Sequence, residues 1–170
     1  MVALVARTGR QLQRYNRNGL RLVVGCIPYR LKTTGDFTDK ALEVLVISAQ
    51  KGHGLVFPKG GWEVDETMKD AACREALEEA GVEGKIQPKL GQWMFKSKSQ
   101  DIFHEGHLFP LLVTELRDLW PEKQTRSRKW VTVVEAREKC QYPWMKEALD
   151  ELVNRLSRSR QRSALAPYNQ

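Results

Sequence analysis

Residues 60–82 read GGWEVDETMKDAACREALEEAGV, and this stretch decides the fold. Two glycines open it, and glycine tolerates backbone angles and close approaches that other residues do not, so a loop is expected at residues 59–61. Thr67 is followed three residues later by Asp70, which resembles a capping box at a helix start. Gly81 stands where a helix-ending glycine belongs. The sequence therefore predicts a helix over about residues 66–80.

Three glutamates of this helix are the main evidence for function. Glu75 and Glu79 are four residues apart and share one helix face, with Glu78 beside them. Like charges so placed repel one another, and a solvated surface is the ordinary explanation of such a face. A bound divalent cation is the alternative, because Mg²⁺ takes carboxylate oxygens while substrate phosphates complete its shell. The glycines and Arg74 at fixed spacing favour the cation.

The full pattern is G-x5-E-x7-R-E-x-x-E-E-x-G-hydrophobic, in which Glu66 is the first glutamate and Arg74 is the arginine. It resembles the Nudix box of Nudix hydrolases at every charged and glycine position. Ala76 stands where that family more often has a larger aliphatic residue, and alanine forms helices well. The resemblance implies an α/β fold, an α/β/α sandwich with a mixed β-sheet between helices.

The rest of the chain fits such a fold. Apolar and β-branched runs predict strands at residues 20–29, 42–48, 55–57, 90–95, 107–114 and 130–134. Loops are expected at residues 32–40, 52–54, 96–106 and 115–127. Pro143 opens a final helix, whose apolar stripe stops before Ser157. We expect a basic N-terminal segment at residues 1–17, one Nudix domain at 18–157 and a flexible tail at 158–170.

Composition limits the partners. At 170 residues the chain fits one domain, and no apolar run approaches the ~18 residues that cross a bilayer, so no membrane partner is expected. The net charge of +7 favours a polyanionic partner.

Three scattered cysteines indicate free thiols in a reducing compartment. We expect a cytoplasmic location that extends to the nucleus, with mitochondria as the alternative because the first 17 residues hold four arginines and no acid.

The resemblance to the Nudix box also implies roles for its residues. Glu75 and Glu79 would be the principal metal ligands, and Glu78 would be a ligand or the general base. The backbone carbonyl of Lys59 would complete one metal shell. Glu66 would buttress the loop or bind an outer metal. The expected ion is Mg²⁺, with Mn²⁺ as an alternative.

Arg74 completes the expected catalytic set with Glu78 and Glu75. An Arg–carboxylate fork would let it orient the acidic side chains without touching substrate. Metal ions can neutralise phosphate charge and activate a water molecule, so the whole set is suited to cleaving phosphoanhydride bonds.

Segments outside the box narrow the resemblance. RLVVGCIPYR, FPKGGWE, EGHLFPLLVTEL and TRSRKWVTVVEA are similar to the diphosphoinositol polyphosphate phosphohydrolase branch, above all to its plant members. That branch implies hydrolysis of diphosphoinositol polyphosphates, long-chain diadenosine polyphosphates, or both. Lys59 stands where diphosphoinositol enzymes usually have glycine, and Glu105 stands where some of them have arginine, so the choice between the two substrates stays open.

Both substrates are soluble, densely phosphorylated small molecules that require several cations. The substrate-binding candidates are Arg21, Ser48, Lys51, Lys59, Gly60, Gly61, Arg126, Arg128 and Lys129. The strongest of these is the basic cluster at residues 126–129 before a strand. A monomer or weak dimer is expected.

Two alternatives remain. Hydrolysis of a capped RNA 5′ end would use the arginine-rich termini, but no stretch combines basic residues with interleaved stacking aromatics, so nucleic acid is not the expected partner. A catalytically silent Nudix binding or regulatory protein would typically lack a box carboxylate, whereas Glu75, Glu78 and Glu79 are all present.

Overall fold

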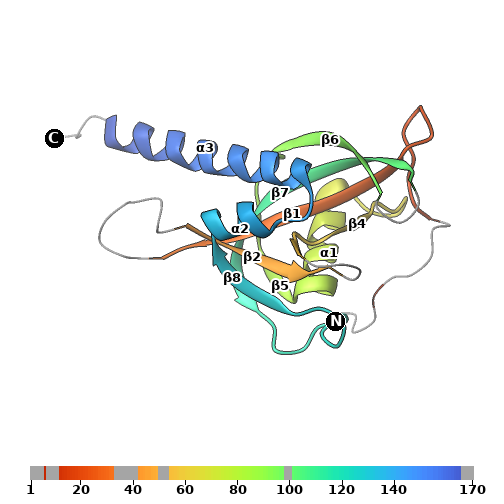
Figure 1. Cartoon of the computed structure of the whole chain (residues 1–170), viewed down its shortest axis with the longest axis horizontal. Helices are drawn as coiled ribbons and strands as arrows, with labels where there is room; N and C mark the ends of the chain where they lie inside the picture. Colours follow the sequence, from red (N-terminus) through yellow and green to blue (C-terminus); the bar gives the residue numbers. More distant parts are fainter. Residues whose placement is uncertain (1–5, 7–11, 33–41, 50–53, 98–100, 166–170) are drawn as a thin grey trace.

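The computed structural model describes residues 6, 12–32, 42–49, 54–97 and 101–165. Within these residues, eight strands form one sheet and three helices accompany it (Figure 1). In chain order the elements are β1 (Arg21–Leu31), β2 (Leu42–Ser48), β3 (Leu55–Val56), β4 (Lys59–Gly61), α1 (Met68–Ala80), β5 (Val82–Ile86), β6 (Gly91–Lys96), β7 (Phe103–Leu116), β8 (Arg128–Thr132), α2 (Val133–Lys139) and α3 (Pro143–Leu165).

The sheet is mixed and centred on β1. This strand pairs in parallel with β7 and antiparallel with β2 and β4, while β8 pairs with β2 and β6 with β7. Its β-branched run is almost wholly buried, with Val24 and Ile27 completely shielded from solvent. A central strand buried on both faces reads as a continuous apolar run, as this one does.

Helices lie on both faces of the sheet. Ala71 and Ala72 of α1 pack with Val24 of β1 and Phe109 of β7 on one face. The second face is covered by α2 and by α3, which runs across the sheet (Figure 1). These layers confirm the α/β/α sandwich with a mixed sheet that the sequence predicts.

The expected helix of the box is confirmed, and its ends follow the predicted capping. The Thr67 hydroxyl accepts a hydrogen bond from the Asp70 amide at 3.1 Å, and the helix begins at Met68. Gly81 ends it in the left-handed region with φ 65°, and its amide donates to the carbonyls of Ala76 and Leu77.

The predicted loop at residues 59–61 is wrong in one respect, because these residues form strand β4 against β1. Gly61, Gly60 and Lys59 lie opposite Val23, Val24 and Gly25. The pairing depends on Gly25, where a Cβ would collide with the carbonyl of Pro58 and with Lys59. Strand β5 was not expected. Its sequence VEGKI has only two aliphatic residues, Val82 and Ile86, and a glycine lies between them.

Several element ends also differ from the expectation. The strand predicted at residues 130–134 runs instead from Arg128 to Thr132, and α2 follows at once. Thr132 caps α2 by accepting from the Glu135 amide at 3.2 Å, a capping signal that the strand-like VTVV run concealed. The last helix does not end near Ser157 but continues to Leu165.

The expected loops at residues 32–40 and 52–54 lie largely outside the described residues. The strand expected at residues 107–114 runs from Phe103 to Leu116, so residues 103–106 and 115–116, which were expected in loops, belong to this strand. Within the residues that the structure describes, no helix is both long and apolar enough to cross a membrane.

Candidate functional site

The three glutamates of α1 are buried rather than solvated. Glu75, Glu78 and Glu79 are 6%, 7% and 6% exposed, which rules out the surface explanation of this acidic face. Strand β4 covers them: a Cβ on Gly60 would collide with the carboxylate of Glu75. The double glycine therefore lets the backbone of β4 lie directly against a carboxylate of the helix.

Arg74 contacts three carboxylates of the site. Its guanidinium donates to the Glu66 carboxylate at 2.7 and 3.0 Å and to the Gly61 carbonyl at 2.9 Å. It also donates to Glu75 at 2.8 Å and reaches Glu78 at 3.4 Å. One side chain thus orients carboxylates from the loop and from the helix at the same time.

Glu66 accepts three hydrogen bonds in this arrangement. Its carboxylate takes the Arg74 fork and also accepts from the Glu63 amide at 3.1 Å. These bonds join the loop to the helix, and both the buttressing role and the outer-metal role of Glu66 stay predictions.

Glu79 faces cationic groups on the other side. Its carboxylate accepts from the Lys59 amide at 3.1 Å, and an Arg126 guanidinium nitrogen lies 3.5 Å from it. Burial raises the pKa of Glu79 to about 7, although Arg126 and Lys59 act in the opposite direction.

Burial likewise raises the pKa of Glu75, together with the negative charges of Glu79 and Glu78, to about 8. Arg74 alone does not neutralise three buried carboxylates. A further positive charge would favour their ionised forms, which is the electrostatic condition of a divalent-cation site.

The donor set fits Mg²⁺ as that ion binds in phosphate-processing sites. Among the described residues, no group of three Asp, Glu, His or Cys side chains converges as a ready-made metal cage. Mg²⁺ does not require one, because it keeps several waters and is bound by one or two carboxylates together with substrate phosphates. Glu75 and Glu79 supply two such carboxylates, and the Lys59 carbonyl stays a predicted ligand.

Two predicted phosphate-binding cations lie close to the carboxylates, and a third lies near one of these two. Lys59 and Arg126 both interact with Glu79. Burial is the main cause that lowers the pKa of Lys59, and the nearby positive charge of Arg21 lowers it further. Arg21 is itself oriented by Gln13, whose side-chain oxygen accepts from it at 2.5 Å.

Ser48 lies near the carboxylates because it contacts Arg126 and Ser127, the two residues before β8. Its carbonyl accepts from Arg126 at 2.9 Å, and its hydroxyl accepts from the Ser127 amide at 3.1 Å. On β4, Gly60 lies against the Glu75 carboxylate, and the Gly61 carbonyl accepts from Arg74. Lys51 lies outside the described residues.

Arg128 and Lys129, the second half of the predicted basic cluster, point elsewhere. The Arg128 guanidinium donates to the carbonyls of Ala80 and Gly81 at the end of α1. The Lys129 ammonium donates to Glu135 of α2 at 3.2 Å on the exposed surface. Only Arg128 and Lys129 of the cluster lie on strand β8, where successive side chains point to opposite faces, so these two cannot both face one pocket.

Sequence reasoning missed the surroundings of Lys59. Its ammonium lies 5.3 Å from the ring of Tyr142 and 5.8 Å from that of Phe95, within cation–π distance of both. Tyr142 comes from the turn before α3 and Phe95 from β6, so no local motif joins them to Lys59.

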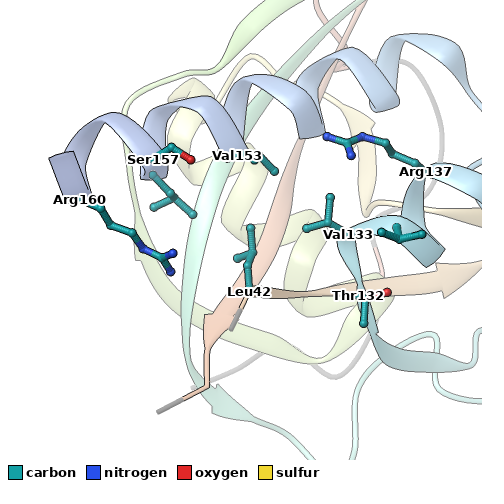
Figure 2. A pocket seen from close by; sticks show the side chains of 9 residues that line it. Leu42, Thr132, Val133, Arg137, Val153, Ser157 and Arg160 are labelled. Atoms are coloured by element: carbon teal, nitrogen blue, oxygen red, sulfur yellow. The ribbon is translucent and has the colours of Figure 1, made fainter. Parts of the chain in front are cut away.

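A groove of about 500 Å³ lies apart from the carboxylates, between α2, α3 and the start of β2 (Figure 2). Its walls are aliphatic, with Leu42 and Val133 among them, and Arg137 and Arg160 stand at its two ends. It shares no residue with the predicted site.

Comparisons with known proteins agree with this geometry. The family model described as NUDIX domain matches residues 20–152. "Nudix hydrolase 18, mitochondrial" from Arabidopsis thaliana is 61% identical over 158 residues, which are 92% of this chain and 89% of the relative. "Diphosphoinositol polyphosphate phosphohydrolase 3-alpha" from Mus musculus is 31% identical, with 84% of each chain covered.

Among solved structures, the C. elegans Ap4A hydrolase superposes with a TM-score of 0.63 at 20% identity, over 81% of this chain and 98% of that one. At this identity the likeness concerns the fold alone.

The expectation of a cytoplasmic location is wrong in the light of these relatives. The Arabidopsis relative at 61% identity is named mitochondrial, as are two others at 60% and 52% identity. The four arginines and the absence of acids in the first 17 residues are the sequence feature that had made mitochondria the alternative.

Proposed function

Because the chain belongs to the Nudix family, we propose that it hydrolyses diphosphoinositol polyphosphates, long-chain diadenosine polyphosphates, or both, with Mg²⁺ as its cofactor. Nudix hydrolases act on pyrophosphate bonds and generally use divalent metals, and this chain is a Nudix pyrophosphohydrolase. The observation that carries the proposal is the buried set of Glu75, Glu78 and Glu79, with Lys59 and Arg126 beside it.

Each residue has a role in this account. Glu75 and Glu79 would hold the ion, which when bound neutralises phosphate charge and lowers the pKa of a water molecule. Glu78 serves as a further ligand or as the general base that takes the proton of the attacking water. Arg74 keeps the carboxylates in place through its bonds to Glu66 and Glu75.

The phosphate chain is bound by the cations beside Glu79. Lys59, Arg126 and Arg21 all lie close enough to this region to interact electrostatically. Guanidinium groups suit phosphate oxygens because their planar forks donate two parallel hydrogen bonds. A chain of several phosphates would therefore be held along these three side chains, while a monophosphate would engage only one or two.

The name of one relative supports this substrate class. The mouse relative at 31% identity is named for diphosphoinositol polyphosphates. Lys59, which stands where diphosphoinositol enzymes usually have glycine, is the feature that favours dinucleoside polyphosphates. We also infer a mitochondrial location from the names of the Arabidopsis relatives, which a fluorescent fusion of the full chain would test.

A single substrate panel tests the proposal. It contains diadenosine penta- and hexaphosphate, diphosphoinositol pentakisphosphate, ADP-ribose, NADH and capped RNA, each with Mg²⁺, with Mn²⁺ and with a chelator. We expect the highest kcat/KM for the diadenosine or diphosphoinositol compounds, and no turnover with chelator. Equal activity on capped RNA would contradict the substrate class. Light scattering on the same preparation tests the inferred monomer or weak dimer.

A further inference from the structure

One arginine outside the box fastens the loop that leads into α1. Arg14 donates from Nε to the Glu63 carbonyl at 3.1 Å, and from Nη2 to the carbonyls of Val64 at 2.9 Å and Glu66 at 3.1 Å. Its guanidinium also stacks over Trp62, 4.2 Å from the ring centroid. The planar fork thus ties the N-terminal segment to three successive points of the loop.

The loop so fastened connects directly to the carboxylates. Glu66, whose carbonyl accepts from Arg14, holds Arg74 through its side chain. Arg74 in turn donates to Glu75 at 2.8 Å and reaches Glu78 at 3.4 Å. Arg14 is therefore linked to the proposed metal ligands through two residues, Glu66 and Arg74.

A second arginine repeats this arrangement at the other end of α1. Arg128 donates from Nη1 to the carbonyls of Ala80 at 2.9 Å and Gly81 at 3.2 Å, and from Nη2 to the Arg117 carbonyl at 2.7 Å. It stacks over Trp120, 4.0 Å from the ring centroid. The last carbonyls of a helix lack intrahelical partners, and a cation there also favours the helix dipole.

The segment that Arg128 fastens carries residues of the site. The Glu122 amide donates to the carbonyl of Glu78 at 2.9 Å. Arg126, four residues further on, lies 3.5 Å from both Glu79 and Glu122. The position of Arg126 relative to Glu79 thus depends on how this segment sits on the end of α1.

We propose that Arg14 and Arg128 are positioning residues, which clamp the two ends of α1 and so keep its carboxylates in the arrangement that binds the metal ion. This inference rests on the proposed function. Each arginine makes three hydrogen bonds to carbonyls and one stacking contact, which lysine cannot reproduce because its ammonium is a point charge without a planar fork. Because its guanidinium donates to three carbonyls, Arg128 affects the site through the end of α1 and does not bind a phosphate.

The test measures Mn²⁺ binding by titration calorimetry in the absence of substrate, for wild type, Arg14→Lys, Arg128→Lys and the double variant. Loss of groups that orient metal ligands typically costs ~10-fold or more in metal affinity. We therefore expect each single variant to raise the Kd for Mn²⁺ about 10-fold. Arg137→Lys is the matched control, since its guanidinium pairs with Asp150 on the exposed surface, and its Kd should equal that of wild type.

Thermal unfolding of the same samples separates positioning from stability. A lower midpoint with an unchanged Kd would make both arginines merely structural and would overturn this inference alone. Wild-type protein that neither binds Mn²⁺ nor hydrolyses the panel would overturn the proposed function and this inference together. Should a lysine variant not fold, Arg14→Met and Arg128→Met keep the apolar stem over the tryptophan and remove only the fork. We expect these to raise the Kd at least as much, and an unchanged Kd would overturn the inference.

Discussion

The Arg74 guanidinium holds the Glu66 carboxylate in a two-point fork, with donor–acceptor distances of 2.7 and 3.0 Å. Glu66 lies in the loop and Arg74 on the helix, so the fork fixes the glycine strand and its loop above the acidic face. The eight-residue spacing of these two residues in the sequence is therefore a distance constraint between two segments of the site. Both side chains are largely buried, at 7% and 14% exposure.

Glu66→Gln should weaken this constraint. The amide keeps an acceptor but loses the charge that binds Arg74, and hydrogen bonds to charged groups contribute about 1.5–3 kcal/mol. We expect the free energy of unfolding to fall by about 2 kcal/mol in urea denaturation. Turnover should fall with it, because Arg74 would no longer be held against Glu75. Unchanged stability and turnover would show that the fork is dispensable.

The raised pKa values of Glu75, about 8, and of Glu79, about 7, predict a pH dependence of stability without metal. A free glutamate titrates near pH 4.3, so the folded state retains protons that the unfolded state releases. The contribution of these two groups is fully present below about pH 4 and is lost as the pH rises to about 8.

Urea unfolding with a chelator from pH 5 to pH 8 measures this effect. Glu79→Gln should be increasingly more stable than wild type toward pH 8, since the amide stays neutral. Saturating Mn²⁺ should stabilise wild type most at pH 8, where its ligands are ionised most easily. A difference between the two proteins that did not vary with pH would refute the raised pKa values.

Gly60→Ala should damage the site while leaving the sheet in place. The added Cβ would collide with the Glu75 carboxylate, so that side chain must move. Displacement of a reacting group by about 1 Å can cost ~10²-fold in rate, and we expect a loss of that order in kcat. Gly61→Ala is the comparison, because its Cβ would meet the amide of Gln13 instead. Equal losses in both variants would argue against a specific effect on Glu75.

Arg126→Ala and Lys129→Ala should separate the two halves of the basic cluster. Arg126 lies beside Glu79, and its loss should raise KM for the preferred polyphosphate about 10-fold, the equivalent of one charge-assisted hydrogen bond. Lys129 donates to Glu135 on the surface and should leave KM within about twofold, as surface ion pairs contribute little. Steady-state kinetics of the two variants would contradict this account if Lys129→Ala had the larger effect.

The sequence predicted the box well because its information is local. Thr67 and Gly81 cap the helix, and the spacing of the glutamates places them on one face, so the helix and its acidic group follow from neighbouring residues alone. The β-branched runs of β1 and β2 were equally direct, and the observed limits of β2 are those predicted.

What the sequence could not supply depends on contacts between distant segments. Arg128 looks like a phosphate ligand in a linear sequence, but Gly81, 47 residues away, offers it a carbonyl. Lys59 gains its aromatic neighbours from Tyr142 and Phe95, which no periodicity links to it. Strand β4 exists because β1 offers it partners, whereas KGG alone has no strand propensity.

If the buried glutamates of α1 drive metal-dependent pyrophosphate hydrolysis, turnover must depend on Glu78, which the Glu78→Gln variant tests. The measurement is kcat on the preferred polyphosphate of the panel, with saturating Mg²⁺ and with circular dichroism to confirm an intact fold. The account predicts a fall of ~10² or more relative to wild type, the usual size of a general acid–base contribution. Turnover close to wild type in the folded variant would contradict it.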